Sequence, residues 1–203
     1  MHVICTDGAK GSWDPDEPVA ELVATRQEEQ RAAARALGGS GDDVAFLGYP
    51  DGELQAGIDE RRALAQWIRR LQPDVVLGHD PWRRYRLHPD HRHAGFLVTD
   101  AIVAARDPHF FPDLGLAPHR PTALLLWEAD EPNHTEDITA FLEPKLRALL
   151  AHRSQFRSTH HIDDPANEAQ VERFRALVAA RAAEHGADAH VDFGERFRII
   201  ADL

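Results

Sequence analysis

Apolar positions follow two periods along the chain, and together they predict strands that alternate with helices. Short apolar or β-branched runs bounded by turn residues or proline predict buried strands. These runs lie at residues 2–6, 44–47, 75–78, 123–127 and 197–200. Apolar residues at helical spacing predict amphipathic helices over residues 18–37, 58–71, 90–105, 140–152 and 165–185. Such alternation, with strands that are apolar almost throughout, is typical of an α/β fold with a parallel sheet covered on both faces.

Length and composition narrow the class of protein. A chain of 203 residues is the usual size of one domain, and without an internal repeat or linker we expect residues 1–203 to form a single domain. The 34 acidic and 23 basic residues give a net charge of -11, which argues against nucleic acid as a partner. The lone cysteine, Cys5, and the absence of a long apolar run predict a cytoplasmic protein without a membrane anchor.

Polar residues of the types that act in catalysis and ligand binding lie in the loops that follow the expected strands. In sheets of this kind, ligands bind beyond the carboxyl ends of the strands. The relevant loops cover residues 7–11, 48–53, 79–91 and 128–134. We therefore expect the functional site among these four segments.

The strongest local signal is His88-Pro89-Asp90-His91, at the start of the helix expected from residue 90. Two imidazoles three positions apart can place one ring on a metal and the other on a substrate atom, and Asp90 can orient an imidazole by accepting its N–H. A helix start capped by Asp90, with two exposed histidines beside it, explains the same residues without chemistry. The spacing alone leaves both interpretations open.

Two further residues have a functional and a structural interpretation. Asp51, in the segment 49–54, either forms a Pro-Asp-Gly turn or accepts hydrogen bonds from the hydroxyl groups of a polyol. Arg26 lies on the apolar side of the first expected helix, so it is either a rim residue whose stem is buried or a buried group that reaches a ligand or a carboxylate.

Taken in order, the motifs of this chain resemble the LmbE/PIG-L family of zinc-dependent N-acetylglucosaminyl deacetylases. The resemblance runs over nearly the whole chain, and His-Pro-Asp-His among these neighbours is its most specific part. The matching segments are Thr6-Asp7-Gly8 with Gly11, Arg26-x-x-Glu29 with Ala33, Leu47 to Leu54, His88-Pro89-Asp90-His91 with Gly95, and His152-x-Ser154-Gln155.

The resemblance implies a Rossmann-like fold and a small-molecule N-acetyl sugar substrate, and it is compatible with a homo-oligomer. It implies that zinc is held by a His and an Asp of an Ala-His-Pro-Asp-Asp segment after the first strand, with His91 as the third ligand. The resemblance also implies that His88 stabilises the transition state or donates a proton, and that Asp90 orients His88. Arg26 and Asp51 become contacts to the sugar or its attached polyol.

The chain departs from the family pattern in one place. It contains no Ala-His-Pro-Asp-Asp segment, so we expect it to lack the family's first strand and to carry an incomplete zinc site. His79 and Asp80, which end an expected strand, are candidate substitute ligands. The main alternative to a deacetylase is a non-catalytic truncated homologue that keeps a sugar- or polyol-binding groove. An unrelated α/β-hydrolase is disfavoured because no Gly-x-Ser-x-Gly elbow occurs.

Overall fold

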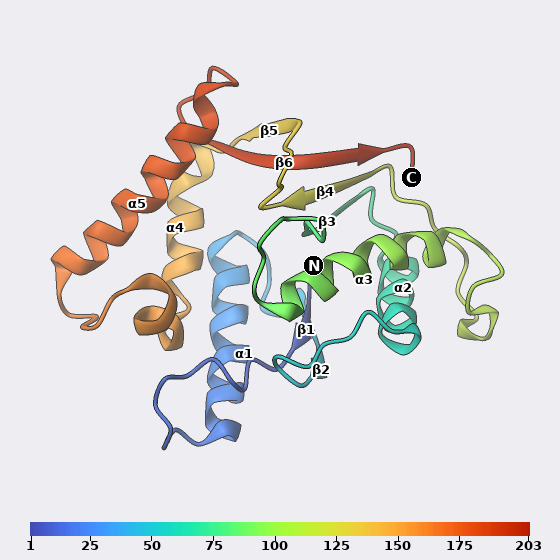
Figure 1. Cartoon of the computed structure of the whole chain (residues 1–203), viewed down its shortest axis with the longest axis horizontal. Coiled ribbons are helices and arrows are strands. Elements are labelled where there is room, and N and C mark those ends of the chain that lie inside the picture. Colours follow the sequence, from blue (N-terminus) through green and yellow to red (C-terminus); the bar gives the residue numbers. More distant parts are fainter. The chain divides into compact units, whose positions relative to one another are not determined.

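Strands and helices alternate over the first 127 residues, as the apolar pattern predicts (Figure 1). The computed structural model describes residues 1–203. In chain order the main elements are β1 (His2–Thr6), α1 (Val19–Ala36), β2 (Val44–Tyr49), α2 (Ile58–Leu71), β3 (Val75–His79), α3 (Pro89–Arg106), β4 (Ala123–Trp127), β5 (His134–Asp137), α4 (Leu142–Leu150), α5 (Glu168–Ala187) and β6 (Gly194–Ala201). Short 3₁₀ helices at Pro112–Leu114, Thr139–Phe141 and Arg153–Gln155 and a π-helix at Phe156–His160 complete the chain. The α/β class is confirmed.

The strands form two open sheets. β1 and β2 pair in parallel and make a sheet of two strands, in which β1 has β2 as its one strand neighbour. The second sheet has the order β3-β4-β6-β5. Its β3 and β4 are parallel, whereas β6 runs antiparallel to β4, so the last strand departs from the parallel arrangement. The expectation that the family's first strand is absent stays a prediction.

The chain divides into two compact units. Unit 1 consists of residues 1–51 and 136–195, and unit 2 consists of residues 52–135 and 196–203. The chain passes from one unit to the other after residue 51, within β5 and within β6. The expectation of a single domain over residues 1–203 stays a prediction.

In unit 1, α1 packs against β2 and α4. The buried residues of α1 include Leu22, Glu29 and Ala33, which recur at helical spacing with Arg26 between them. Because positions three and four apart share one face of a helix, Arg26 and Glu29 are carried on the inward side of α1. This placement determines what both charged groups contact.

In unit 2, α2 and α3 pack against each other, and α3 also packs on β3. The approach of α3 to the end of β3 depends on Gly95, because a Cβ at this position would lie 2.7 Å from the carbonyl oxygen of His79 and 2.8 Å from the backbone nitrogen of Pro81. Contacts that short occur only when backbone shifts. Gly95 therefore lets the first turns of α3 lie directly against the carboxyl end of β3.

A buried arginine closes the other end of α3. Arg69 of α2 is 3% exposed, and its guanidinium donates hydrogen bonds to the carbonyl oxygens of Ala104, Ala105 and Asp107 at distances of 2.9 to 3.0 Å. These carbonyls belong to the last turn of the helix and the residue after it, where intrahelical donors are missing. The guanidinium thus satisfies acceptors that would otherwise be buried without a partner.

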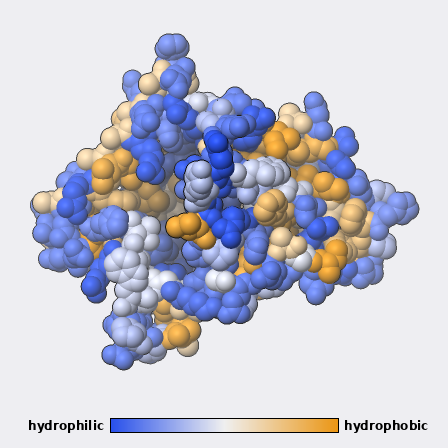
Figure 2. All heavy atoms as spheres, in the orientation of Figure 1, coloured by the Kyte–Doolittle hydropathy of each residue, from blue (hydrophilic) through white to orange (hydrophobic).

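Hydrophilic residues cover most of the face seen in Figure 2, and apolar residues appear there in separate patches. The large apolar side chains with high exposure include Trp13 at 69% and Trp82 at 57%. No helix has the length and apolar character needed to cross a lipid bilayer.

Candidate functional site

The carboxyl ends of β3 and β4 meet in unit 2. The two strands are parallel and in register, with His79 opposite Trp127, so Glu128 follows directly after the residue that faces His79. His91 lies on α3 one turn before Gly95, and the close approach at that glycine brings the two imidazoles together. The rings of His79 and His91 stack with their centroids 4.4 Å apart.

His79, His91 and Glu128 form a group with the composition of a metal site. Each offers one ligand atom, and these atoms all lie within 4.8 Å of one another. Two imidazoles and a carboxylate are a donor set that zinc uses in hydrolases. With Arg86, these residues are called the histidine cluster below.

The hydrogen bonds of the cluster determine which of these ligand atoms are available to a metal ion. The indole N–H of Trp127 donates to Nδ1 of His79 over 2.8 Å. Nη1 of Arg86 lies 3.0 Å from Nδ1 of His91, and the same guanidinium bonds the carboxylate of Glu128. Since a guanidinium only donates, Nδ1 of His91 accepts. His91 and Glu128 therefore direct their acceptor atoms at one cation.

The protonation states suit this arrangement. Burial, reinforced by the nearby His79, His88 and Arg86, lowers the pKa of His91 to about 4. The contact with His79 and then the charge of Arg86 lower the pKa of Glu128 to about 2, against the effect of burial. At neutral pH the cluster thus presents a neutral imidazole and a carboxylate, the forms that bind cations.

The cluster fits a metal ion in part. The guanidinium of Arg86 stands where His91 and Glu128 can hold a cation, so a metal would replace it. His79 is a weaker candidate, because its accepting nitrogen is used by Trp127 and the neutral ring then carries its proton on the other nitrogen. Asp80, the other substitute ligand considered, instead accepts from the backbone N–H groups of Trp82 and Asp130 at 2.9 Å each.

Glu128 also has an unusual backbone. Its φ is 52°, in the left-handed region that residues other than glycine seldom adopt. Such conformations cost about 1–3 kcal/mol and persist where the surroundings fix them, often at functional sites. The turn after β4 therefore holds this carboxylate towards the cluster against a local preference.

The other two residues of the His-Pro-Asp-His motif differ in burial. His88 precedes the first turn of α3, is exposed, and has its ring centroid 4.9 Å from that of His91. Asp90 is 5% exposed and accepts from the backbone N–H groups of Gly52 at 2.7 Å and Leu54 at 3.2 Å. Asp90 thus fixes the segment after residue 51, and its role in orienting His88 stays a prediction.

Arg26 and Asp51 belong to unit 1, where both hold one loop. Arg26 donates to the carbonyl oxygens of Gly8 at 2.8 Å and Gly11 at 3.0 Å. The carboxylate of Asp51 accepts from the backbone N–H of Lys10 at 3.0 Å. Both residues therefore shape the loop after β1, and their contact with a sugar stays a prediction.

Glu29 links the first and last motifs of the sequence. Its carboxylate, which is 9% exposed, accepts from the backbone N–H and the hydroxyl of Ser154, both at 2.7 Å. This bond anchors the His152-x-Ser154-Gln155 segment to α1. Because Glu29 stands one turn from Arg26, one helix face holds two loops of unit 1.

Sequence reasoning gave no role to two residues of the cluster, Glu128 and Arg86, or to Trp127, which donates to His79. The loop that contains Glu128 was identified, and the rule that parallel strands end at one edge could have singled it out as the first residue after β4. Trp127 could have been found as the last residue of the same strand. Arg86 had no such signal, since it lies in an irregular loop.

Known proteins resemble this chain in sequence and structure. The model of the PIG-L family, described as GlcNAc-PI de-N-acetylase, matches residues 1–102. Diacetylchitobiose deacetylase from Thermococcus kodakarensis is 38% identical over 159 residues, which cover 77% of this chain and 59% of that protein. 1D-myo-inositol 2-acetamido-2-deoxy-alpha-D-glucopyranoside deacetylase from Geodermatophilus obscurus is 30% identical over 216 residues, covering 91% and 68%. This chain therefore spans less than two thirds of the Thermococcus protein.

The same likeness extends to solved structures. N,N'-diacetylchitobiose deacetylase from Pyrococcus horikoshii matches with a TM-score of 0.84 and 34% identity, over 98% of this chain and 72% of that one. The fold of the whole chain is thus that of the matched enzyme.

Proposed function

Because this chain belongs to the PIG-L family of de-N-acetylases, we propose that it acts as a zinc-dependent hydrolase that removes the acetyl group from an N-acetylated amino sugar or a related conjugate. In this reaction water adds to the amide carbonyl, the C–N bond breaks, and the products are acetate and a free amine. The relatives named above, which are deacetylases of N-acetyl sugars, support this substrate class.

One observation carries the proposal: His91 and Glu128 both contact the guanidinium of Arg86 at the carboxyl ends of β3 and β4, so their acceptor atoms converge on one positive charge. The site lies where α/β sheets hold their ligands. The lowered pKa of His91, about 4, keeps its ring neutral at pH 7, which is the form that binds a metal. We therefore assign His91 and Glu128 as metal ligands contributed by unit 2.

A bound zinc ion would lower the pKa of water and polarise the amide oxygen. The remaining work falls to side chains of the chain. His88 is exposed beside His91 and can donate a proton to the leaving amine or stabilise charge on the amide oxygen. Asp90 fixes the adjoining backbone at Gly52. Arg26 and Asp51 are assigned to sugar binding through the loop at residues 8–11.

A non-catalytic sugar-binding homologue is the second candidate, and Arg86 is the observation that favours it. Its guanidinium fills the place where His91 and Glu128 hold a cation, so it competes with a metal. If Arg86 prevents metal binding altogether, the chain binds a sugar or polyol without turnover. Arg86→Ala would then bind zinc where the unchanged protein binds none.

The deciding experiment measures amine release from N,N'-diacetylchitobiose and from N-acetylglucosamine. We expect release in the presence of zinc, loss of activity with a chelator, and recovery when zinc is added back. Stoichiometric zinc without amine release would favour the non-catalytic homologue. Release that a chelator leaves unchanged would contradict the metal-dependent mechanism.

The cellular location and the oligomeric state of the protein are proposed from fewer observations. A single cysteine, Cys5, supports a reducing, cytoplasmic location. A homo-oligomer fits the proposed enzyme, and light scattering at several protein concentrations tests it.

A further inference from the structure

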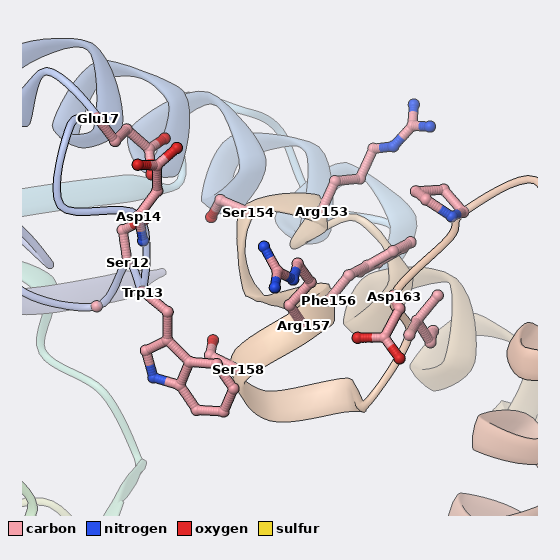
Figure 3. Close-up of a pocket in the computed structure, with 13 residues that line it drawn as sticks. Ser12, Trp13, Asp14, Glu17, Arg153, Ser154, Phe156, Arg157, Ser158 and Asp163 are labelled. Carbon is pink, nitrogen blue, oxygen red and sulfur yellow. The ribbon is translucent and has the colours of Figure 1, made fainter.

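One wall of a pocket in unit 1 is formed by a rare element, the π-helix Phe156–His160. The pocket, called the Trp13 pocket below, has a volume of about 300 Å³ and is lined by the loop after β1 and the segment 153–165. Figure 3 shows Trp13 contributed by the loop and Arg157 and Ser158 contributed by the π-helix. Helices of this type are frequent at functional sites. The backbone of this wall therefore points to a role beyond packing.

The last residue of the π-helix, His160, is a buried titratable group without a hydrogen-bond partner on one nitrogen. It is 7% exposed, and its ring lies against Phe156, with centroids 5.5 Å apart, and against Phe174 of α5, with centroids 4.4 Å apart. Because the buried Nδ1 has no partner, the neutral ring carries its proton on the other nitrogen. Protonation turns Nδ1 into a buried donor on a charged ring without an acceptor, which is costly.

The charged groups near His160 do not offset this cost. Burial and the neighbouring His152 and His161 lower its pKa below 6.5, and Glu29 of α1 opposes them only in part. Helix α5 adds a positive charge nearby, since Arg173 donates to the carbonyl oxygen of His161 at 2.9 Å. The closed structure therefore keeps the ring neutral at a pH where an exposed imidazole takes up a proton.

Hydrogen bonds that do not involve His160 hold the chain on both sides of the π-helix. Before it, the backbone N–H and the hydroxyl of Ser154 donate to the carboxylate of Glu29, both at 2.7 Å. After it, the backbone N–H of Asp163 donates to the side-chain oxygen of Gln170 at 2.7 Å. Residues 156–162 can therefore leave their packing while the chain stays fixed at either end.

We propose that residues 156–162 form a pH-dependent flap: protonation of His160 expels its imidazole from between the two phenylalanine rings and moves the π-helix wall away from the Trp13 pocket. In the open flap, water solvates the charged ring, which has the ordinary pKa of about 6.5. Below that pH the open form binds a proton that the closed form resists, so opening is favoured as the pH falls. The flap belongs to unit 1 alone and does not depend on the deacetylase function proposed above.

The test is hydrogen exchange followed by mass spectrometry at pH 7.5 and pH 5.5, corrected for the change of the chemical exchange rate with pH. We expect the protection of the amides of residues 156–162 to fall about tenfold at the lower pH, because one proton is taken up one pH unit below the ordinary pKa of histidine. Helix α1, in the same unit, should keep its protection. A loss of equal size in α1 would overturn the proposal, since unit 1 would then unfold as a whole.

Three variants assign the effect to one imidazole. His160→Phe and His160→Gln carry no titrating group at this position, so both should show the same protection of residues 156–162 at the two pH values. His161→Asn is the matched control, because it removes the adjacent exposed histidine, and it should keep the tenfold loss. Equal protection at both pH values in the unchanged protein would overturn the proposal. So would a loss that persists in both His160 variants, since another group such as His152 would then carry it.

Discussion

The histidine cluster of unit 2 and the Trp13 pocket of unit 1 use polar side chains in opposite ways. In the cluster, the imidazoles, the carboxylate of Glu128 and Arg86 contact one another, and these contacts and burial lower the pKa of His91, while the contacts lower the pKa of Glu128. In the pocket of unit 1 that Trp13 helps to line, the side chains of Glu17, Arg157 and Asp163 form no ion pair and no side-chain hydrogen bond. The difference teaches that a cluster with perturbed pKa values is suited to chemistry, whereas unpaired groups around a cavity are suited to recognition.

The largest effect is expected from His91→Ala, which removes the ligand on which the proposed chemistry depends. We expect kcat/KM for amine release to fall by about a thousandfold or more, because losing a ligand costs more than the ten- to hundredfold typical of an outer-sphere change. His109→Ala, at an exposed histidine, is the control and should stay within about twofold. Steady-state kinetics at saturating zinc measures both, and comparable activity in the two variants would remove His91 from the mechanism.

A second effect concerns stability and sharpens the contrast between paired and unpaired groups. Arg69→Ala leaves several carbonyls at the end of α3 without a donor, so we expect a loss of about 3 kcal/mol in the free energy of unfolding. The neighbouring Arg70, which is exposed over the ring of Trp67, is the control. Urea denaturation measures the difference, and equal midpoints for the two variants would contradict the role given to Arg69.

Gly95→Ala tests how the cluster is positioned. A methyl group there meets backbone atoms at 2.7 to 2.8 Å, so α3 must shift away from β3, at a cost of about 2 kcal/mol. The shift also moves His91 from His79, so activity should fall although no polar group is removed. Thermal melts and amine release are compared with those of Ala94→Gly at the preceding position of the helix. A Gly95→Ala protein with unchanged activity would show that the close approach is dispensable.

The smallest effect is a pH dependence in unit 1. His160 is buried between the rings of Phe156 and Phe174, its Nδ1 has no partner, and burial lowers its pKa below 6.5, helped by His152 and His161 and opposed by Glu29. Below about pH 6.5 the unfolded chain therefore takes up a proton that the folded protein resists.

Stability supplied by neutral His160 is thus complete above about pH 6.5 and is lost as the pH falls towards the lowered pKa. His160→Phe should make the free energy of unfolding less dependent on pH over this interval. His109→Phe should leave its slope against pH unchanged. Denaturant titrations between pH 7 and 5 measure it. An unaltered slope in His160→Phe would mean that other groups, such as His152, carry the dependence.

The sequence predicted those elements whose own residues decide their structure. α2 and α3 were found because apolar residues recur at helical spacing, and their observed bounds agree within one or two residues. β5 was missed because His134–Asp137 has no apolar pattern and is a strand through its pairing with β6. The antiparallel direction of β6 was missed for a similar reason, since direction in a sheet depends on partners distant in sequence.

The candidate site shows the same limit. His91 and His88 were identified from a motif of four residues, and their proximity follows from one helical turn. The contact of His91 with Glu128 through Arg86 joins residues 86, 91 and 128, and it depends on strand register and on a loop without a pattern. Likewise, the motif predicted sugar contacts for Arg26 and Asp51, whereas only the structure shows that both hold the loop beside the Trp13 pocket.

The most direct test is a zinc titration, by calorimetry, of the unchanged protein and of His91→Ala. The account predicts one zinc ion per chain for the unchanged protein and a loss of affinity of at least about a hundredfold when the imidazole of His91 is removed. Equal zinc affinity in both proteins would contradict it, because the histidine cluster would then not be where the metal binds.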